Sequence, residues 1–254
     1  MAGHSHWAGI KHKKAATDRK RSKLWSKLSK AIIVAAKLGG GDPDANARLR
    51  NAIQEAKSLS LPKENIERAI KRGIGELDGD NVEEILYEGY GPAGVAVLCE
   101  IMTDNRNRTA PEIRKTFDVY GGSLGATGCV GYLFERKGIL TIVEPSPESG
   151  ITEERIVEVA MEQSAEDVAT TDDGFEILCA PESLSALADA FTDAGITADM
   201  NRVVRIPSMT VDVDENVAPR ILKLLEALED HDDVQNISTN LNFSHPPVAK
   251  LLNQ

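Results

Sequence analysis

The sequence is poor in the features that mark secreted, membrane-spanning and metal-binding proteins. Its 254 residues include three cysteines, Cys99, Cys129 and Cys179, which lie far apart and form no Cys-x-x-Cys pair. This spacing fits neither a disulfide framework nor a zinc site, and it indicates small buried residues in a reducing compartment. The longest apolar run, Ala31 to Ala36, is far too short to span a bilayer, and the N-terminus lacks the apolar region of a signal peptide. We therefore expect a soluble cytoplasmic protein without a membrane partner.

We recognise no constellation of residues that would indicate catalysis. The sequence has no His-Glu-x-x-His pair that could hold a catalytic zinc. Adjacent carboxylates occur, for example at Glu83-Glu84 and at Asp232-Asp233, but these two pairs lie in acidic stretches that we expect to be solvated. We therefore predict that the protein is not an enzyme and that it holds neither a cofactor nor a metal.

Positive charge is scarce overall and concentrated at one end of the chain. The formal net charge is -11, yet residues 1–72 hold 17 Lys and Arg against 6 Asp and Glu. Residues 73–254 hold 12 against 34, so the first part carries +11 and the second -22. This asymmetry indicates that a polyanion binds the N-terminal part, because the acidic remainder would repel it.

Apolar periodicity predicts three helices that follow a basic arm. Residues 1–22 have no apolar period and are rich in Gly, His and cations, so we interpret them as the arm. From Lys23 apolar residues recur every three or four positions, which is typical of an amphipathic helix. We expect a second helix capped by Asp42 and a third that ends at Gly73. These helices form a predicted domain over residues 23–79.

The rest of the chain predicts two ferredoxin-like domains with the element order β-α-β-β-α-β. Residues 138–206 contain all six elements, and residues 80–137 and 207–245 form a second, discontinuous domain into which the first is inserted. Residues 246–254 are left as a tail. The predicted fold class is therefore α+β, with an N-terminal three-helix domain and basic arm followed by two ferredoxin-like α/β sandwich domains.

Particular elements are predicted within the discontinuous domain. Strands are expected at 95–101, 130–136 and 209–213, and a break at Lys137-Gly138 separates this domain from the inserted one. A helix is expected to start with a capping box at Thr109.

The arm is the first candidate site for a nucleic acid. Its cations suit phosphate groups, and an exposed indole beside cations suits stacking on a base. The candidate residues are His4, His6, Trp7, Lys11, His12, Lys13, Lys14, Arg19, Lys20, Arg21 and Lys23. Three alternatives stay open, namely a solvated tail, a Trp7 side chain packed on the helical domain, and a metal bound by the His-x-His pair.

The second candidate site is the segment between a strand and a helix that contains Arg106 and Arg108. Both arginines are expected just before the helix N-terminus, where free N–H groups and the helix dipole favour an anion. The alternative is a structural loop in which either arginine pairs with Asp104 or Glu112.

The stretch from Gly121 to Cys129 contains four glycines within eight residues and could allow a ligand to approach the backbone closely. Its spacing matches neither a P-loop nor a dinucleotide fingerprint, and a tight turn or bulge explains it equally well. The stretch is therefore only weak evidence for a nucleotide site.

Several motifs occur in one order along the chain. They are Met1 to Trp7, Ile10 to Ala16, Ala35 to Pro43, Leu61 to Lys71, Tyr87 to Pro92 and Asp104 to Thr109. With these motifs the chain closely resembles the YebC/PmpR family, which includes the mitochondrial translational activator of cytochrome c oxidase. The resemblance covers essentially the whole chain. It implies a three-domain, non-enzymatic protein of gene expression: bacterial members are described as probable transcriptional regulators that bind promoter DNA, and others help ribosomes through proline-rich stretches.

Three hypotheses of function follow. The first is a DNA-binding transcriptional regulator, and the alternative is a ribosome-associated translation factor that relieves stalling on proline-rich sequences. The third, an enzyme that uses Arg106 and Arg108, is much weaker. The expected partner is promoter DNA or ribosomal RNA, and the sequence shows no dimerisation heptads, so we expect a monomer.

Overall fold

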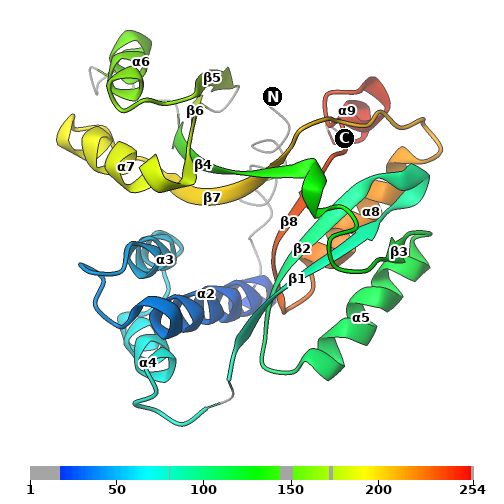
Figure 1. The fold of residues 1–254 in the computed structure, drawn as a ribbon, viewed down its shortest axis with the longest axis horizontal. Coiled ribbons are helices and arrows are strands. Elements are labelled where there is room, and N and C mark those ends of the chain that lie inside the picture. Colours follow the sequence, from blue (N-terminus) through cyan, green and yellow to red (C-terminus); the bar gives the residue numbers. More distant parts are fainter. Residues whose placement is uncertain (1–17, 80, 144–150, 172–173, 253–254) are drawn as a thin grey trace. The chain divides into compact units, whose positions relative to one another are not determined.

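The computed structural model describes residues 18–79, 81–143, 151–171 and 174–252, and these residues form two compact units. One unit is Glu135–Ile206, and the other comprises the described residues within Ala8–Phe134 and Pro207–Gln254. The predicted α+β class is confirmed, because three helices are followed by two four-stranded antiparallel sheets (Figure 1). None of the described helices is long and apolar enough to cross a membrane.

Three helices open the larger unit and share one apolar core. They are α2 (Asp18–Gly39), α3 (Ala47–Ser58) and α4 (Lys63–Gly73). Ile32, Leu49 and Ile66 are among the buried side chains of this core, to which Val82 and Met102 of the following segment also belong. The helices therefore pack on the start of the sheet region through a continuous apolar contact.

Two details of these helices differ from the sequence prediction. Helix α2 begins at Asp18, so the last residues assigned to the arm are helical. Helix α3 is capped by Asn46, whose side chain accepts from the Leu49 N–H at 3.1 Å, whereas Asp42 accepts from Asp44 N–H within a preceding turn. Asn46 is the better cap because its amide also donates to the carbonyls of Ala35 and Gly40.

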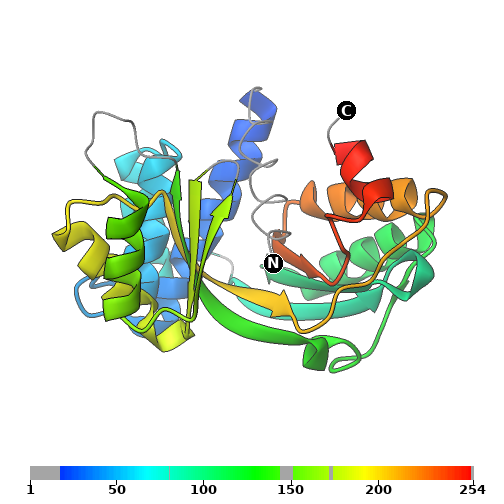
Figure 2. The same cartoon turned by 90° about the horizontal axis from the view of Figure 1, so that it is seen from above.

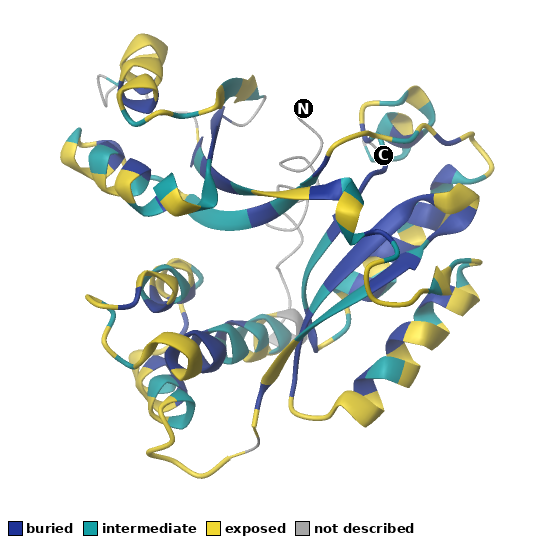
Figure 3. Cartoon of the chain, in the orientation of Figure 1, coloured by how far each residue is buried: buried dark blue, intermediate teal, exposed yellow. Residues whose placement is uncertain are grey.

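The first sheet belongs to the larger unit and has the strand order β3-β1-β2-β8. Its strands are β1 (Glu83–Tyr90), β2 (Ala96–Thr103), β3 (Ser123–Leu124) and β8 (Val234–Thr239). Helices α5 (Arg106–Val119) and α8 (Ala218–Glu229) lie side by side on one face of this sheet (Figure 2). Figure 3 shows that β2 is buried along most of its length and that buried and exposed residues alternate along both helices.

The segments predicted as strands at 130–136 and 209–213 do not pair as strands of this sheet. Gly131–Leu133 form a 3-10 turn, and Val211 makes only an isolated bridge to Leu241. Val130 and Phe134 are buried against Ala96 and Leu98 of β2. The strand prediction is therefore wrong over residues 130–133, where Val130 covers a face of the sheet, whereas residues 134–136 begin strand β4 (Phe134–Val143) of the second sheet.

The second sheet forms the smaller unit and has the order β5-β6-β4-β7. Its elements in chain order are β4 (Phe134–Val143), α6 (Glu153–Glu162), β5 (Asp167–Thr171), β6 (Gly174–Cys179), α7 (Leu184–Asp193) and β7 (Met200–Pro207). This is the ferredoxin-like order β-α-β-β-α-β. Ile156 of α6 and Phe191 of α7 are fully buried in its core.

The expected break at Lys137-Gly138 is wrong, because β4 runs through both residues. Gly138 pairs with Cys179 of β6, and a Cβ at this glycine would lie only 2.7 Å from the Cys179 Sγ. The glycine therefore serves the close approach of two strands, and it does not mark a turn. At the other end of the chain, residues assigned to the tail form helix α9 (Pro246–Leu252), in which Val248 is buried.

Candidate nucleic-acid interface and the Asp233 cluster

Most of the predicted arm residues fall outside the part of the chain that the structure describes. These residues are His4, His6, Trp7, Lys11, His12, Lys13 and Lys14. Arg19 and Lys20 lie in the first turns of α2, and Arg21 is exposed one residue further on. Lys23 is the next candidate, and its side chain has acidic neighbours.

Lys23, Lys27 and Lys30 face the C-terminal end of α8. The Lys23 ammonium donates to the Asp230 carbonyl at 2.9 Å, and that of Lys27 donates to the Glu229 carbonyl at 2.6 Å. The last carbonyls of a helix lack partners within the helix and carry the negative end of its dipole. The three lysines, which we call the lysine row, therefore attach α2 to the end of α8.

Lys23 also lies 3.1 Å from the Asp232 carboxylate, but both side chains are substantially exposed. This contact therefore contributes little to the stability of the fold. The contact of Lys30 is different, since its partner Asp233 is 1% exposed.

Asp233 accepts hydrogen bonds from four side chains. Lys30 Nζ donates to Oδ1 at 2.5 Å, and Arg108 Nη2 donates to Oδ2 at 2.8 Å. The hydroxyls of Thr109 and Thr103 reach Oδ2 at 2.6 Å and 3.1 Å. These five residues, the Asp233 cluster, join α2, β2, α5 and the turn between α8 and β8 in one buried network.

The backbone completes this network. Asp233 O accepts from the Met102 N–H at 2.9 Å, and Asp233 N–H donates to Nδ1 of His231 at 3.1 Å. His231 Nδ1 is therefore an acceptor, and its Nε2 is left to donate to Glu112 of α5 at 3.1 Å. The histidine thus adds a second connection between the turn and α5, apart from the Asp233 carboxylate.

Burial and hydrogen bonding act in opposite directions on the pKa of Asp233. Burial disfavours the charged form, but the hydrogen bonds from Lys30, Thr109 and Arg108 outweigh it and hold the pKa of this carboxyl well below its usual range. The hydrogen bond to Asp233 in turn raises the pKa of Arg108 above its usual value, against a smaller effect of desolvation. Asp233 is therefore an ionised, buried anion at neutral pH.

The two predicted arginines lie inside the first turn of α5, not before it. The helix starts at Arg106 with Asn105 as its N-cap, and Pro111 lies inside the helix. Arg108 contacts Asp104 at 3.1 Å besides Asp233, and Arg106 is 3.8 Å from Glu83 with 64% of its side chain exposed. The ion-pair alternative therefore describes Arg108, whereas Arg106 presents its charge to solvent.

The cluster includes residues that sequence reasoning did not single out. Asp233 was expected to be solvated, and this is wrong, although Glu83, Glu84 and Asp232 are exposed. Lysines at positions i, i+4 and i+7 of α2 share one helix face, and that spacing was the available signal for a docking surface. It could not identify the acidic partner.

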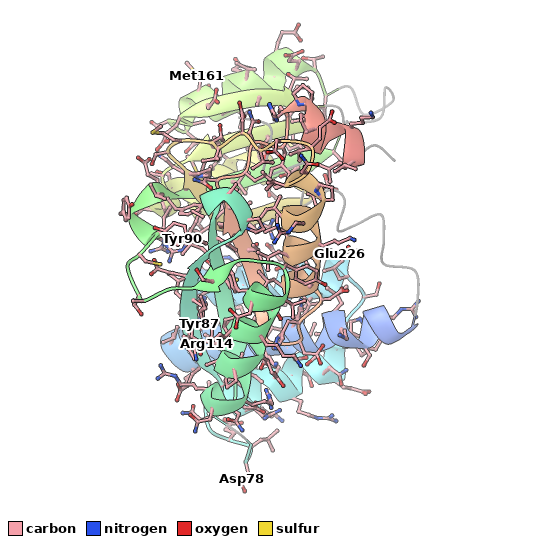
Figure 4. All side chains as sticks on the ribbon, turned by 90° about the vertical axis from the view of Figure 1, so that its right-hand side faces the viewer. Asp78, Tyr87, Tyr90, Arg114, Met161 and Glu226 are labelled. Atoms are coloured by element: carbon pink, nitrogen blue, oxygen red, sulfur yellow. The ribbon has the colours of Figure 1, made fainter. Side chains whose placement is uncertain are left out.

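The glycine-rich stretch encloses an anion that the protein itself supplies. Glu88 of β1 is 4% exposed, and its carboxylate accepts from the N–H groups of Gly128, Val130 and Gly131 at 2.7 to 2.9 Å. Tyr90, labelled in Figure 4, donates its hydroxyl to the Cys129 carbonyl at 2.8 Å. These backbone donors are occupied, so the stretch is a turn held by Glu88, as the structural alternative required.

Two short serine patterns lack the geometry of hydrolases. Gly121 to Gly125 has the spacing Gly-x-Ser-x-Gly, but Ser123 lies in strand β3 paired with Tyr90, not on a strand-to-helix turn. Ser60 precedes Lys63 by three residues, and the ammonium of that lysine lies 3.7 Å from Glu67.

The remaining side chains of metal-binding type are dispersed. Within the described ranges no three His, Cys, Asp or Glu side chains are placed to hold a metal ion. All three cysteines are free thiols; Cys99 and Cys179 are buried, and burial raises the pKa of Cys99 to about 12 and that of Cys179 to about 11. These thiols are protonated at neutral pH.

Helices α5 and α4 of the larger unit are among those that carry exposed cations. Arg114, labelled in Figure 4, and Lys115 lie on the exposed side of α5. Arg68 and Lys71 lie on the exposed side of α4.

The fold and site define an α+β protein with a basic N-terminal helical region fastened to an acidic body. The chain matches the N-terminal domain of the TACO1/YebC protein over residues 5–76 and the TACO1/YebC second and third domain over residues 82–241. It belongs to the TACO1/YebC family.

Relatives and a solved structure support this assignment. A "Probable transcriptional regulatory protein" of Rhodopirellula baltica is 58% identical over 98% of this chain and 100% of its own length. One of the same name from Natranaerobius thermophilus is 51% identical over 96% of this chain and 97% of its own. The crystal structure of a conserved hypothetical protein from Aquifex aeolicus has a TM-score of 0.84 at 47% identity and covers 93% of this chain and 96% of its own.

Proposed function

We propose that this protein is a non-enzymatic gene-expression factor that binds nucleic acid, with duplex DNA as its target and transcription as the process it regulates. The observation that carries this proposal is the charge of residues 1–22, which hold six Lys and Arg against one Asp. The names of the relatives, which describe probable transcriptional regulators, support the choice of DNA.

The contacts of the lysine row sharpen this proposal. Lys23, Lys27 and Lys30 are engaged by the acidic end of α8. The cations offered to phosphates are therefore those that precede the row, together with Arg106. Arg108 has a positioning role, because it holds the start of α5 through Asp233 and Asp104.

The test is a deletion of residues 1–17, which removes Lys11, Lys13 and Lys14, three of the six Lys and Arg of residues 1–22, and leaves α2 intact from Asp18. Duplex affinity is measured by fluorescence anisotropy across a series of salt concentrations. We expect a severe loss of affinity and unchanged thermal unfolding. The salt dependence should also become less steep, by about 0.9 in log-log slope for each phosphate that the shortened protein no longer neutralises.

A matched pair of variants separates position from total charge. Three lysines of the arm are replaced by Gln in one variant, and three exposed cations of α4 are replaced in the other. The two sets are Lys11, Lys13 and Lys14, and Lys63, Arg68 and Lys71. The arm variant should lose much more affinity, and an equal loss in both variants would contradict a binding site in the arm.

The physiological target is decided by sedimentation of a cell lysate through sucrose at low and moderate salt. Promoter binding predicts that the protein stays out of ribosomal fractions. Migration with ribosomes that depends on residues 1–17 would instead assign the same cations to ribosomal RNA and support the translation factor.

A further inference from the structure

A pocket lies between α2 and the α3–α4 connection, just after the basic segment of the sequence. It has a volume of about 370 Å³ and is lined by Arg21, Leu24, Trp25, Ser58, Leu59 and Ser60. We call it the Trp25 pocket. Ligand pockets in proteins begin at roughly 300 Å³, so this one suits a single ring system with its substituents.

The indole of Trp25 forms an apolar wall with a fixed orientation. Its Nε1 donates to the Leu59 carbonyl at 3.4 Å, and the half-buried ring packs against the apolar core of the helical segment. The ring edge is thus held while part of the side chain faces the pocket. Leu24 and Leu59, both half-buried, extend the apolar surface on either side.

Polar and charged groups surround this apolar wall. Ser58 and Ser60 are exposed, and the Ser58 hydroxyl donates to the Glu55 carbonyl at 2.9 Å, so its oxygen can still accept a hydrogen bond. Arg21 is exposed on one side of the pocket, and Lys57 is exposed next to Ser58 in the chain. The pocket therefore combines a flat apolar wall, two hydroxyls and one cation, Arg21.

A ligand that matches this set has a flat aromatic ring, polar ring edges and an anionic substituent. We infer that the Trp25 pocket holds one unpaired base of a single-stranded nucleic-acid segment, with the base on the indole and a neighbouring phosphate near Arg21. Stacking on an aromatic side chain is largely independent of base identity. This inference rests on the proposed function and adds to it a site for an unpaired base.

The first measurement uses a Trp7→Phe variant, in which Trp25 is the sole tryptophan. Addition of a thymidine 15-mer should quench the fluorescence of Trp25, because the ring stacks on a base. In anisotropy titrations, Trp25→Leu should weaken binding of the 15-mer at least fivefold, and Trp25→Phe should retain affinity within about threefold. Affinity for a 15-base-pair duplex should change less than twofold in both variants.

Trp25 also packs on the core, so a second pair of variants keeps the test independent of folding. Ser58→Glu places a carboxylate at the pocket, and Gln54→Glu places the same charge one turn earlier on the exposed side of α3. Ser58→Glu should weaken 15-mer binding several-fold more than Gln54→Glu.

The outcomes separate the two proposals. Equal affinity for the 15-mer in wild type, Trp25→Leu and Ser58→Glu would overturn the base site and leave the proposed function standing. Failure of the full chain to bind either duplex or single strand would overturn both.

Discussion

Lys30 Nζ donates to Oδ1 of Asp233 at 2.5 Å, although 203 positions separate the two residues in the sequence. Only 16% of the lysine side chain and 2% of the aspartate side chain are exposed. The pair connects the N-terminal helix to the turn before the last strand of the first sheet, and Arg108 and two threonines complete the shell of the carboxylate.

Asp233→Asn should destabilise the protein by about 3 kcal/mol at pH 7, because it leaves Lys30 and Arg108 without their common anion. The pKa of Asp233 is lowered in the folded state. Its stabilising effect is therefore complete above the unfolded pKa of about 3.9, and it is lost as the pH falls toward the depressed folded value. The difference in unfolding free energy between wild type and variant, measured in urea, should narrow below about pH 4. A difference that stays constant down to pH 2 would contradict this account.

We expect the residues of the lysine row to contribute unequally to the free energy of unfolding. Lys30→Met removes the ammonium from a largely buried ion pair and should cost about 2 kcal/mol. Lys23→Met affects an exposed contact and should cost less than about 0.5 kcal/mol. Urea unfolding of both variants measures this order, and equal costs would show that burial does not distinguish the two contacts.

Glu88→Gln should loosen the glycine-rich turn and cost about 2 kcal/mol. The amide has one acceptor oxygen where the carboxylate serves three N–H groups, and its NH2 would face a donor. Amide hydrogen exchange should accelerate at Gly128, Val130 and Gly131. Glu84→Gln on the same strand is the control, because Glu84 is exposed; protection that survives in Glu88→Gln would refute the role of the carboxylate.

Gly73→Ala should destabilise the helical segment, although helix propensity alone predicts a gain of about 1 kcal/mol. A Cβ at Gly73 would lie 2.6 Å from both the Ala36 Cβ and the Ile33 carbonyl oxygen of α2. Overpacking of this kind costs about 1 to 3 kcal/mol. The sign of the change in melting temperature is decisive, with the exposed Arg68→Ala as the reference substitution on the same helix.

The sequence predicts those elements whose signals are local. The helices around Ile156 and Phe191, the strands that follow them, and the end of α4 at Gly73 all follow from apolar periodicity and turn residues. The strand expected at 130–136 is wrong in its first part for a tertiary reason, because Val130 covers the sheet instead of pairing in it, whereas its last part, from Phe134, lies in β4.

The candidate site was harder to predict because its central contacts are long-range. Whether an aspartate in an acidic stretch is solvated or buried depends on partners elsewhere, and Asp233 finds its partners at Lys30 and Arg108. The N-cap of α3 is also decided by contacts that the local sequence does not reveal. Asp42 and Asn46 are both good capping residues, and contacts of Asn46 with Ala35 and Gly40 decide between them.

The lysine row gives the protein a different N-terminal surface during synthesis than after it. Lys23 and Lys27 reach carbonyls 207 and 202 positions downstream, so their acceptors do not exist when α2 leaves the ribosome. At about 5 to 20 residues per second, translation of the intervening chain takes on the order of 10 to 40 seconds. For that interval the nascent helix carries uncompensated ammonium groups beside ribosomal RNA. Once the turn after α8 has been made and folded, its carbonyls and carboxylates engage these ammonium groups.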